Sequence, residues 1–498
     1  MPGCIDIDGF DRSRSRFEEV VDFLDGVGAS VLSHGDLENR LDTEGRELIR
    51  VLYQDHLDLR AAREERVGEV LDADGVDRPS VEPAHRRTLT TIFGEVAVTR
   101  LAYRRRGHPN LHPADAALNL PVEHHSHGIR RLAAVEAARG SFDDAAATIR
   151  QRTGTHVGKR QVEELTARAA ADFAAFYTSH PRPPAAPDEV VVVSVDAKGI
   201  VMRPEALRPA TRSAAARSTT KLETRLSKGE KRNRKRLAEV GAVYTVVPAP
   251  RTARDVLAHD DTGVRPPAPT AKDKWLTASV VNDAATVVAA VFDEAERRDP
   301  THERTWVALV DGNNHQIERI TAEAARLGVN VSIVCDFIHV IEYLWRAAWN
   351  FYPEADPAAE TWVHDKATAI LDGKASIVAA AIRRKATRRH LTIPDRANAD
   401  RAADYLLNKA PYLDYPTALA NGWPIATGII EGACRHLVKD RMDITRARWG
   451  LNGAEAVLQP RALRCNSDFD DYWHYHLNQE QHRLHETPYN NHIIPTAA

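Results

Sequence analysis

The 498-residue sequence has few cysteines and no long apolar run. Its four cysteines, at positions 4, 335, 434 and 465, are scattered and form no Cys-x-x-Cys pair. This scarcity argues against a disulfide framework and favours a reducing compartment. No apolar stretch approaches the roughly 20 residues needed to cross a bilayer. The acidic N-terminal segment also lacks the basic start and apolar stretch of a secretion signal. The sequence therefore predicts a cytoplasmic protein with no membrane partner.

The small net charge of −3 hides a strong segregation of charge along the chain. Residues 1–80 are acid-rich, whereas 203–236 and 383–389 are basic. A solvated basic helix is the ordinary interpretation of such an island, but its density of cations favours contact with nucleic-acid phosphates. Within the basic insertion 205–238, the cations that we expect to contact DNA are Arg225, Lys228, Lys231, Arg232, Arg234, Lys235 and Arg236.

Three apolar, mostly β-branched runs each end in an aspartate. The runs 190–195, 306–310 and 329–335 lead to Asp196, Asp311 and Asp336, and each predicts a buried strand that delivers a carboxylate to its end. A Lys-Gly turn after Asp196 leads to a second apolar run at 200–202. A third strand begins at Gly241 and is followed by a Pro- and Asp-rich loop to about residue 272.

The element order after residue 188 is three strands, helix, strand, helix, strand, helix. That order matches an α/β ribonuclease H-like core, a mixed sheet flanked by helices. Its last helix, 428–442, carries Glu431 in the first turn. Phosphodiester cleavage uses divalent ions held by a few carboxylates, and Asp196 and Asp311 lie side by side in this topology. Each acid alone could simply cap a turn, but the combination predicts a metal site.

The N-terminal region is predicted to be mainly helical with one β-hairpin at 86–103. Between 141 and 168, two short helices flank a turn containing Gly154, and the first begins with a capping box of Ser141 and Asp144. The second opens with Lys159 and Arg160. This pattern fits a helix-turn-helix that contacts DNA or a plain helical hairpin, and the sequence leaves both open.

A proline-rich linker at 181–187 gives the clearest boundary. The predicted domains are a helical region with a hairpin (1–125), a helix-turn-helix-like region (126–180), the first part of the core (188–344), an all-helical insertion (345–425), and the final core helix with the C-terminal tail (426–498).

Several stretches together carry a family resemblance. They are Val195-Asp-Ala-Lys-Gly-Ile-Val-Met202, Leu226-Ser-Lys-Gly-Glu-Lys-Arg-Asn-Arg-Lys-Arg236, Val310-Asp-Gly-Asn-Asn-His-Gln316, Asp336-Phe-Ile-His-Val-Ile-Glu-Tyr-Leu-Trp345, Gly428-Ile-Ile-Glu-Gly-Ala-Cys-Arg-His-Leu-Val-Lys-Asp-Arg-Met442, and Trp449-Gly with Gly453-Ala-Glu-Ala456. From Asp196 to about Trp473, the chain resembles bacterial insertion-sequence transposases of the DDE type, in the branch related to Mutator-like elements.

The resemblance implies that Asp196, Asp311 and Glu431 are catalytic and bind Mg²⁺, with Mn²⁺ as a substitute. It places Asp336 and His339 in the (Asp/Cys)-x-x-His motif of these elements, and it also implies the helical insertion. For Asp336 and His339 we weigh two roles, one beside the scissile phosphate and one as a hydrogen-bonded pair that supports the Glu431 helix. In the stretch from Gly428 to Met442, Arg435 and Lys439 complete the predicted DNA contacts.

The chain departs from its relatives in two places. Relatives often carry paired cysteines after the hairpin, whereas residues 103–112 here contain none. The histidines nearby offer a second possibility for binding metal, but without thiolates. We expect surface histidines and no zinc site at His108, His112, His124, His125 and His127. Ala197 stands where relatives commonly have glycine. We expect Cys335 to be buried as a small apolar residue.

The expected protein is a transposase acting on the bacterial chromosome. Its partners would be double-stranded DNA, as terminal inverted repeats and as target, and a second copy of the chain. The alternatives are a stand-alone ribonuclease H-like nuclease and a domesticated DNA-binding regulator that does not cleave.

Overall fold

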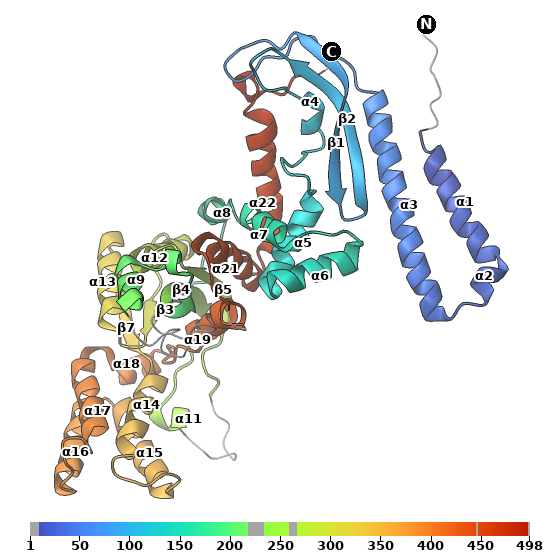
Figure 1. Cartoon of the computed structure of the whole chain (residues 1–498). Helices are drawn as coiled ribbons and strands as arrows, with labels where there is room; N and C mark the ends of the chain where they lie inside the picture. The colour runs from blue at the N-terminus through green and yellow to red at the C-terminus, as the bar shows by residue number, and fades with distance from the viewer. Residues whose placement is uncertain (1–8, 218–233, 258–265, 445–446, 497–498) are drawn as a thin grey trace. The chain divides into compact units, whose positions relative to one another are not determined.

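The computed structural model describes residues 9–217, 234–257, 266–444 and 447–496 (Figure 1). The chain forms two compact units, Met1–Ser179 with Ser467–Ala498, and His180–Asn466. No helix among the described residues is both long enough and apolar enough to pass through a bilayer.

The first unit begins with helices and a long β-hairpin. Its helices α1 (Asp11–Asp25), α2 (Val27–Ser30) and α3 (His34–Ala62) precede strands β1 (Ser80–Thr91) and β2 (Gly94–Arg104). The two strands pair antiparallel and turn between Thr91 and Gly94, where Gly94 has a φ of 122°. Only glycine adopts this backbone readily. The hairpin predicted at 86–103 is therefore confirmed and slightly longer.

Three helices of the first unit share one apolar core. After the short α4 (Pro113–Ala116) come α5 (His127–Arg139), α6 (Phe142–Thr153), α7 (Lys159–Ala169) and α8 (Phe173–Ser179). The core residues come from α5, α6, α7 and the α6–α7 turn. The capping box of Ser141 and Asp144 is present, and Gly154 ends α6 in the left-handed conformation. The predicted helix–turn–helix arrangement is thus confirmed as local structure.

The last part of the chain joins the first unit. Helix α22 (Phe469–Gln481) is followed by the π-helical turn η4 (His482–Glu486) and the 3₁₀ turn η5 (Asn490–His492). Arg130 of α5 is fully buried and donates to Glu480 of α22 at 2.6 Å. Residues 467–498, which the sequence grouped with the core helix, therefore belong to the unit that contains α5.

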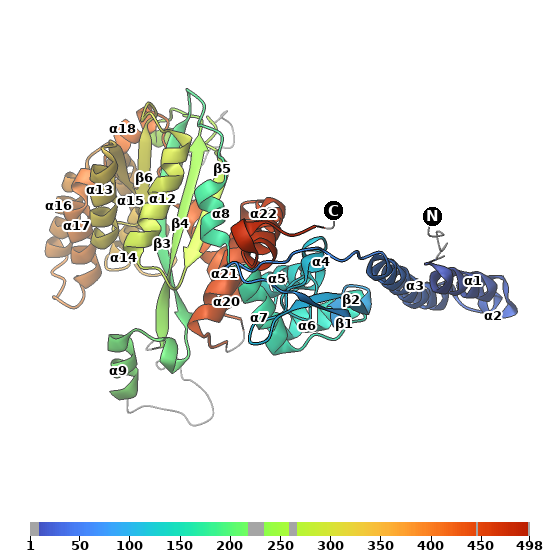
Figure 2. The same ribbon diagram turned by 90° about the horizontal axis from the view of Figure 1, so that it is seen from above.

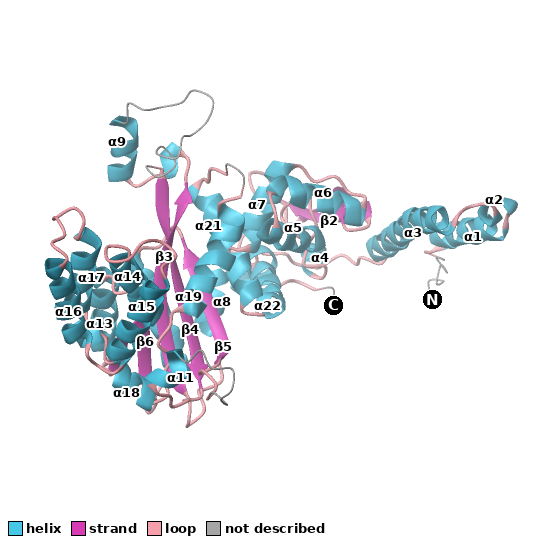
Figure 3. Cartoon of the chain, turned by 90° about the horizontal axis from the view of Figure 1, so that it is seen from below, coloured by secondary structure: helices cyan, strands magenta, loops and turns pink. Residues whose placement is uncertain are grey.

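The second unit contains a mixed five-stranded sheet with the strand order β5-β4-β3-β6-β7 (Figure 3). The strands are β3 (Val190–Val201), β4 (Lys235–Val246), β5 (Ala271–Ser279), β6 (Trp306–Val310) and β7 (Val331–Cys335). β3, β4 and β5 pair antiparallel, whereas β6 and β7 run parallel to β3.

Two strand predictions need correction. β3 does not end at Asp196 but runs without a turn to Val201, because β4 pairs with it along its whole length. The run 200–202 is therefore not a separate strand. The strand predicted to begin at Gly241 is β4, which begins earlier, at Lys235. The third antiparallel strand is β5, which follows the predicted loop and which the sequence did not indicate. Figure 2 shows β3 and β4 continuing beyond the rest of the sheet toward α9.

Helices cover both faces of the antiparallel strands. α12 (Ala284–Arg298) packs on the face that carries Gly241, where an added Cβ would lie 2.4 Å from a methyl group of Val291. Gly241 pairs with Val195, whereas Asp196 pairs with Val240. Because side chains alternate along a strand, Asp196 points to the opposite face.

The other helices of this unit are η1 (Pro204–Ala206), α9 (Pro209–Arg217), α11 (Ala253–Leu257) and α13 (Asn314–Leu327). Between 337 and 420 the chain forms α14 (Phe337–Ala348), α15 (Pro357–Leu371), α16 (Ala375–Arg388), α17 (Ala397–Asn408), η2 (Ala410–Tyr412) and α18 (Tyr415–Ala420). This segment contains helices, turns and loops, as the sequence predicts for the insertion.

The final core segment is not one regular helix. It consists of α19 (Gly428–Ala433), the π-helical stretch η3 (Cys434–Lys439) and α20 (Asp440–Met442), followed by α21 (Leu451–Cys465). A single α-helix over 428–442 was predicted. Such π-helical interruptions are frequent at functional sites.

Candidate active site

Three aspartates lie at one level of three neighbouring parallel strands. Ser194 of β3 pairs with Leu309 of β6, so that Asp196 and Asp311, each two residues further on, hold corresponding positions. Val310 pairs with Cys335, and Asp311 and Asp336 each follow one residue later. The register therefore places all three carboxylates at the same edge of the parallel strands, as the apolar runs predict.

Asp196 and Asp311 are each half-buried and held by local hydrogen bonds. Oδ1 of Asp196 accepts from the amide of Ala197 at 2.7 Å, and Oδ2 accepts from the thiol of Cys434 at 3.2 Å. Oδ1 of Asp311 accepts from the amide of Asn313 at 2.8 Å. Each carboxylate thus keeps oxygen lone pairs for a ligand while its orientation is restrained.

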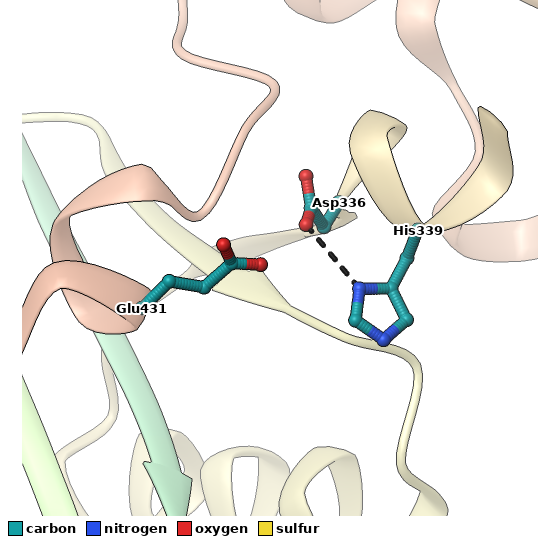
Figure 4. A group of neighbouring side chains, drawn as sticks. All are labelled: Asp336, His339 and Glu431. Atoms are coloured by element: carbon teal, nitrogen blue, oxygen red, sulfur yellow. Dashed lines mark ion pairs between the residues drawn. The ribbon is translucent and has the colours of Figure 1, made fainter. Parts of the chain in front are cut away.

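Asp336, His339 and Glu431 form the closest cluster of ligand-bearing side chains. One ligand atom from each lies within 4.8 Å of the others (Figure 4). Asp336 caps α14 and is fully buried, His339 is half-buried on the same helix, and Glu431 is exposed on α19. Among the described residues, this is the group of three that could hold a metal ion.

The carboxylate of Asp336 is saturated with hydrogen bonds. Oδ2 accepts from the hydroxyl of Thr427 at 2.7 Å and lies 3.5 Å from Nδ1 of His339. Oδ1 accepts from the backbone amides of Ile338 at 3.0 Å and Thr427 at 3.3 Å. Thr427 is the residue that begins α19. Asp336 therefore fixes the start of the helix that carries Glu431.

The pKa values of the pair shift in opposite directions. Burial raises the pKa of Asp336, but the bonds from His339, Thr427 and the two amides outweigh burial, and the pKa falls below its ordinary value. The bond to Asp336 is the main cause that raises the pKa of His339. The geometry thus favours an ionised Asp336 that stabilises a protonated imidazole.

The structure brings the predicted acids to one region but groups them differently. The ligand atoms of Asp196, Asp311 and Glu431 are not all within 4.8 Å of one another, whereas those of Glu431, Asp336 and His339 are. Cys434, three residues after Glu431, connects the two sets because its thiol bonds Asp196. Burial, followed by Asp196, raises the pKa of that thiol, and Glu431 also contributes.

Sequence reasoning missed Thr427 and the contact of Cys434. No pattern in the sequence indicates that Thr427 would reach Asp336, which lies 91 positions earlier. For Cys434, the spacing of three residues from Glu431 on one helix was an available signal. Cys335 is fully buried, as predicted, and burial raises its pKa to about 12.

The donor set fits a hard divalent cation. The accessible carboxylates supply oxygen ligands, which Mg²⁺ and Mn²⁺ prefer, and no thiolate is available from the buried Cys434. Asp196, Asp311 and Glu431 are the acids with accessible oxygens, because Asp336 is fully buried.

The predicted DNA-contacting cations have mixed surroundings. Lys159 and Arg160 are exposed at the start of α7 and pair with Asp143 and Glu164. In the second unit, Arg234 is half-buried, and Lys235, Arg435 and Lys439 are exposed. Arg225, Lys228, Lys231 and Arg232 lie outside the described residues.

Arg236 is engaged inside the protein. Its guanidinium donates to the backbone carbonyls of Val280 at 2.7 Å and of Ala206 and Val281 at 3.4 Å. These bonds hold the start of β4 in place. Fewer N–H groups of Arg236 therefore remain for DNA than we expected from the sequence.

The expectation of surface histidines holds for His108 and His124 and is wrong for the other three. His125 is buried, and burial lowers its pKa. His112 and His127 are half-buried, and burial lowers the pKa of each to about 4. The ring of His112 stacks on His85 of β1, and Nε2 of His127 lies 2.7 Å from the carbonyl oxygen of Asn119. The sequence does not indicate either contact.

Comparison of the chain with protein-family models gives no match, and comparison with curated protein sequences gives none either.

Proposed function

We propose that the chain is a DNA transposase of the DDE type that cleaves and joins DNA strands with the help of divalent metal ions. The observation that carries this proposal is the register of Asp196, Asp311 and Asp336 on three parallel strands, with Glu431 brought to the same edge by α19. Carboxylates that converge at a sheet edge are what phosphodiester chemistry with Mg²⁺ requires.

The topology supports a ribonuclease H-like core. The order β5-β4-β3-β6-β7, with three antiparallel strands followed by two strands parallel to β3, is the order that such a core has. The helices between α14 and α18 interrupt the core between Asp336 and Glu431. A simple nuclease has no need of this insertion or of the large first unit, so both favour the transposase.

The residues of the site have separable roles. Asp196, Asp311 and Glu431 would hold Mg²⁺ or Mn²⁺. Bound divalent ions supply an activated hydroxyl and stabilisation of the leaving oxygen. Asp336 positions Glu431 through Thr427, and His339, whose pKa Asp336 raises, lies beside Asp336 and Glu431. Terminal repeats and target DNA would be the substrates, and two ends would need at least two copies of the chain.

The test is strand cleavage of a labelled duplex that carries the DNA flanking the gene, with Mg²⁺ or Mn²⁺. We expect nicking that depends on metal and falls at least about a hundredfold in Asp196→Asn, Asp311→Asn and Glu431→Gln, with DNA affinity retained. Glu360→Gln is the matched control, since Glu360 is also an exposed acid in the first turn of a helix, α15.

Other outcomes would change either the third metal ligand or the function. Cleavage that survives Glu431→Gln but not Asp336→Asn would make Asp336 the third ligand. Cleavage without any joining of ends would indicate the nuclease. Metal-independent DNA binding with no cleavage by the unsubstituted chain would indicate the regulator.

A further inference from the structure

A cavity of about 390 Å³ opens beside the paired extension of β3 and β4. Its wall comes from the residue before α9, the start of β4, the start of α12 and the first turns of α13. The residues that matter here are Arg208, Lys235, Arg236, Glu239, Asp283 and Arg319. We call it the cationic pocket, since four cationic side chains face two carboxylates, and His315 and Thr211 also line it.

Three of the cations have no ion-pair partner within the described parts of the chain. Arg208, Lys235 and Arg319 are exposed and make no salt bridge there, unlike Arg326 of α13, which pairs with Glu323 and Asp293. Unpaired cations gathered around one cavity repel one another, and an anion in the cavity removes that repulsion.

The carboxylates of the pocket do not neutralise it. Asp283 caps α12, and its Oδ1 accepts from the amide and the hydroxyl of Thr286 at 2.9 and 2.8 Å. Glu239 of β4 lines the pocket, is half-buried and makes no ion pair within the described residues. The fourth cation, Arg236, is held by backbone carbonyls, so that it adds a fixed positive charge.

The pocket and the acids flank the same end of β3. Glu239 pairs with Ala197, the residue after Asp196. Alternation of side chains puts Glu239 on the face opposite Asp196, and α12 covers that face. A phosphate in the pocket would therefore be a different one from the phosphate at the acids, since phosphates repeat along each DNA strand.

We propose that the cationic pocket binds a backbone phosphate of duplex DNA, with Arg208, Lys235 and Arg319 as the contacting side chains. This proposal rests on the proposed function for the identity of the anion. Arg208 and Lys235, near the two ends of the basic insertion, would thus share one phosphate with Arg319 of α13. The sequence does not indicate that these three residues lie around one cavity.

The test measures affinity of the full-length protein for a labelled duplex in EDTA, over a series of salt concentrations. For Arg208→Ala and Arg319→Ala we expect roughly tenfold weaker binding. The slope of log affinity against log salt should become shallower by about 0.9 for each removed charge. Arg319→Lys should restore the slope, and Arg326→Ala, on the same helix but already paired, should leave it unchanged.

Two results would overturn the proposal. One is an unchanged salt slope in both alanine variants. The other is that inorganic phosphate binds the unsubstituted chain but not the alanine variants, while all of them bind DNA equally well. That result would mark a site for a free anion. The binding assay contains EDTA and therefore no free divalent metal. A negative result in it is thus distinct from a negative result in the metal-dependent cleavage assay. A protein that binds through the pocket but never cleaves would refute only the proposed function.

Discussion

The thiol of Cys434 donates a hydrogen bond to Oδ2 of Asp196 over 3.2 Å, linking the helix of Glu431 to the central strand. Asp196 and Glu431 are 235 positions apart in the chain, so this contact sets how the two acids face each other. Cys434 is buried, which makes the donor hard to replace by water.

Replacement of Cys434 should therefore affect cleavage according to whether a donor remains. Cys434→Ala is expected to lower the cleavage rate roughly threefold to tenfold, the range for the loss of one ordinary hydrogen bond, since a thiol is a weak donor. Cys434→Ser should stay within about threefold of the unsubstituted chain, since serine keeps a donor. Equal rates for alanine and serine would show that the contact does not orient Asp196.

Thr427→Val should lower the free energy of unfolding by about 1–3 kcal/mol, because the buried Asp336 loses its shortest hydrogen bond. Chemical denaturation followed by fluorescence measures this. Thr361→Val is the control, since Thr361 is exposed on α15 and bonds only its own helix. A loss as small as that of the control would contradict the positioning role of Asp336.

Gly312→Ala should disturb the loop after Asp311. Gly312 has a φ of 92°, and an added Cβ would lie 2.8 Å from the hydroxyl of Tyr405, which donates to the backbone oxygen of Asp311. We expect a loss of about 1–3 kcal/mol in unfolding free energy and slower cleavage. Gly432→Ala, next to Glu431 but with no atom within 4 Å, should be neutral or stabilising by up to about 1 kcal/mol.

Arg130→Met should destabilise the first unit strongly. Arg130 is fully buried and donates to Glu123 at 2.7 Å and Glu480 at 2.6 Å. Its removal leaves Glu123 and Glu480 with only the more exposed Arg168 and Arg483 as partners, at a cost of about 3 kcal/mol. Arg131→Met, the neighbouring exposed position paired with Asp470, should cost less than about 1 kcal/mol. Similar unfolding curves for the two variants would argue against the buried network.

Acid should weaken the first unit through the half-buried His127. Burial lowers the pKa of His127 from 6.5 to about 4, so that between these values the unfolded chain binds a proton that the folded chain does not. Stability is therefore full above pH 6.5 and falls with pH down to about 4, by at most about 3 kcal/mol for this residue. His127→Gln should flatten that part of the profile, whereas His34→Gln, exposed on α3, should not.

The local parts of the fold could be predicted from the sequence because their causes are local. The capping box at Ser141, the glycine that ends α13 at Gly328, and the β-branched runs that lead to Asp196 and Asp311 each act within a few residues. Their spacing also gave the right order of the core helices and the acids that follow the parallel strands.

Only the tertiary structure decided the features that depend on distant partners. β4 pairs along the whole of β3 and carries it past the expected turn at Gly199. Thr427 reaches Asp336, and Arg130 draws α22 into the first unit. The residues in these contacts are far apart in the sequence, and the sequence alone does not show that they are close in space. The sequence by itself thus determined which acids exist and where strands bear them, and the packing decided which of them meet.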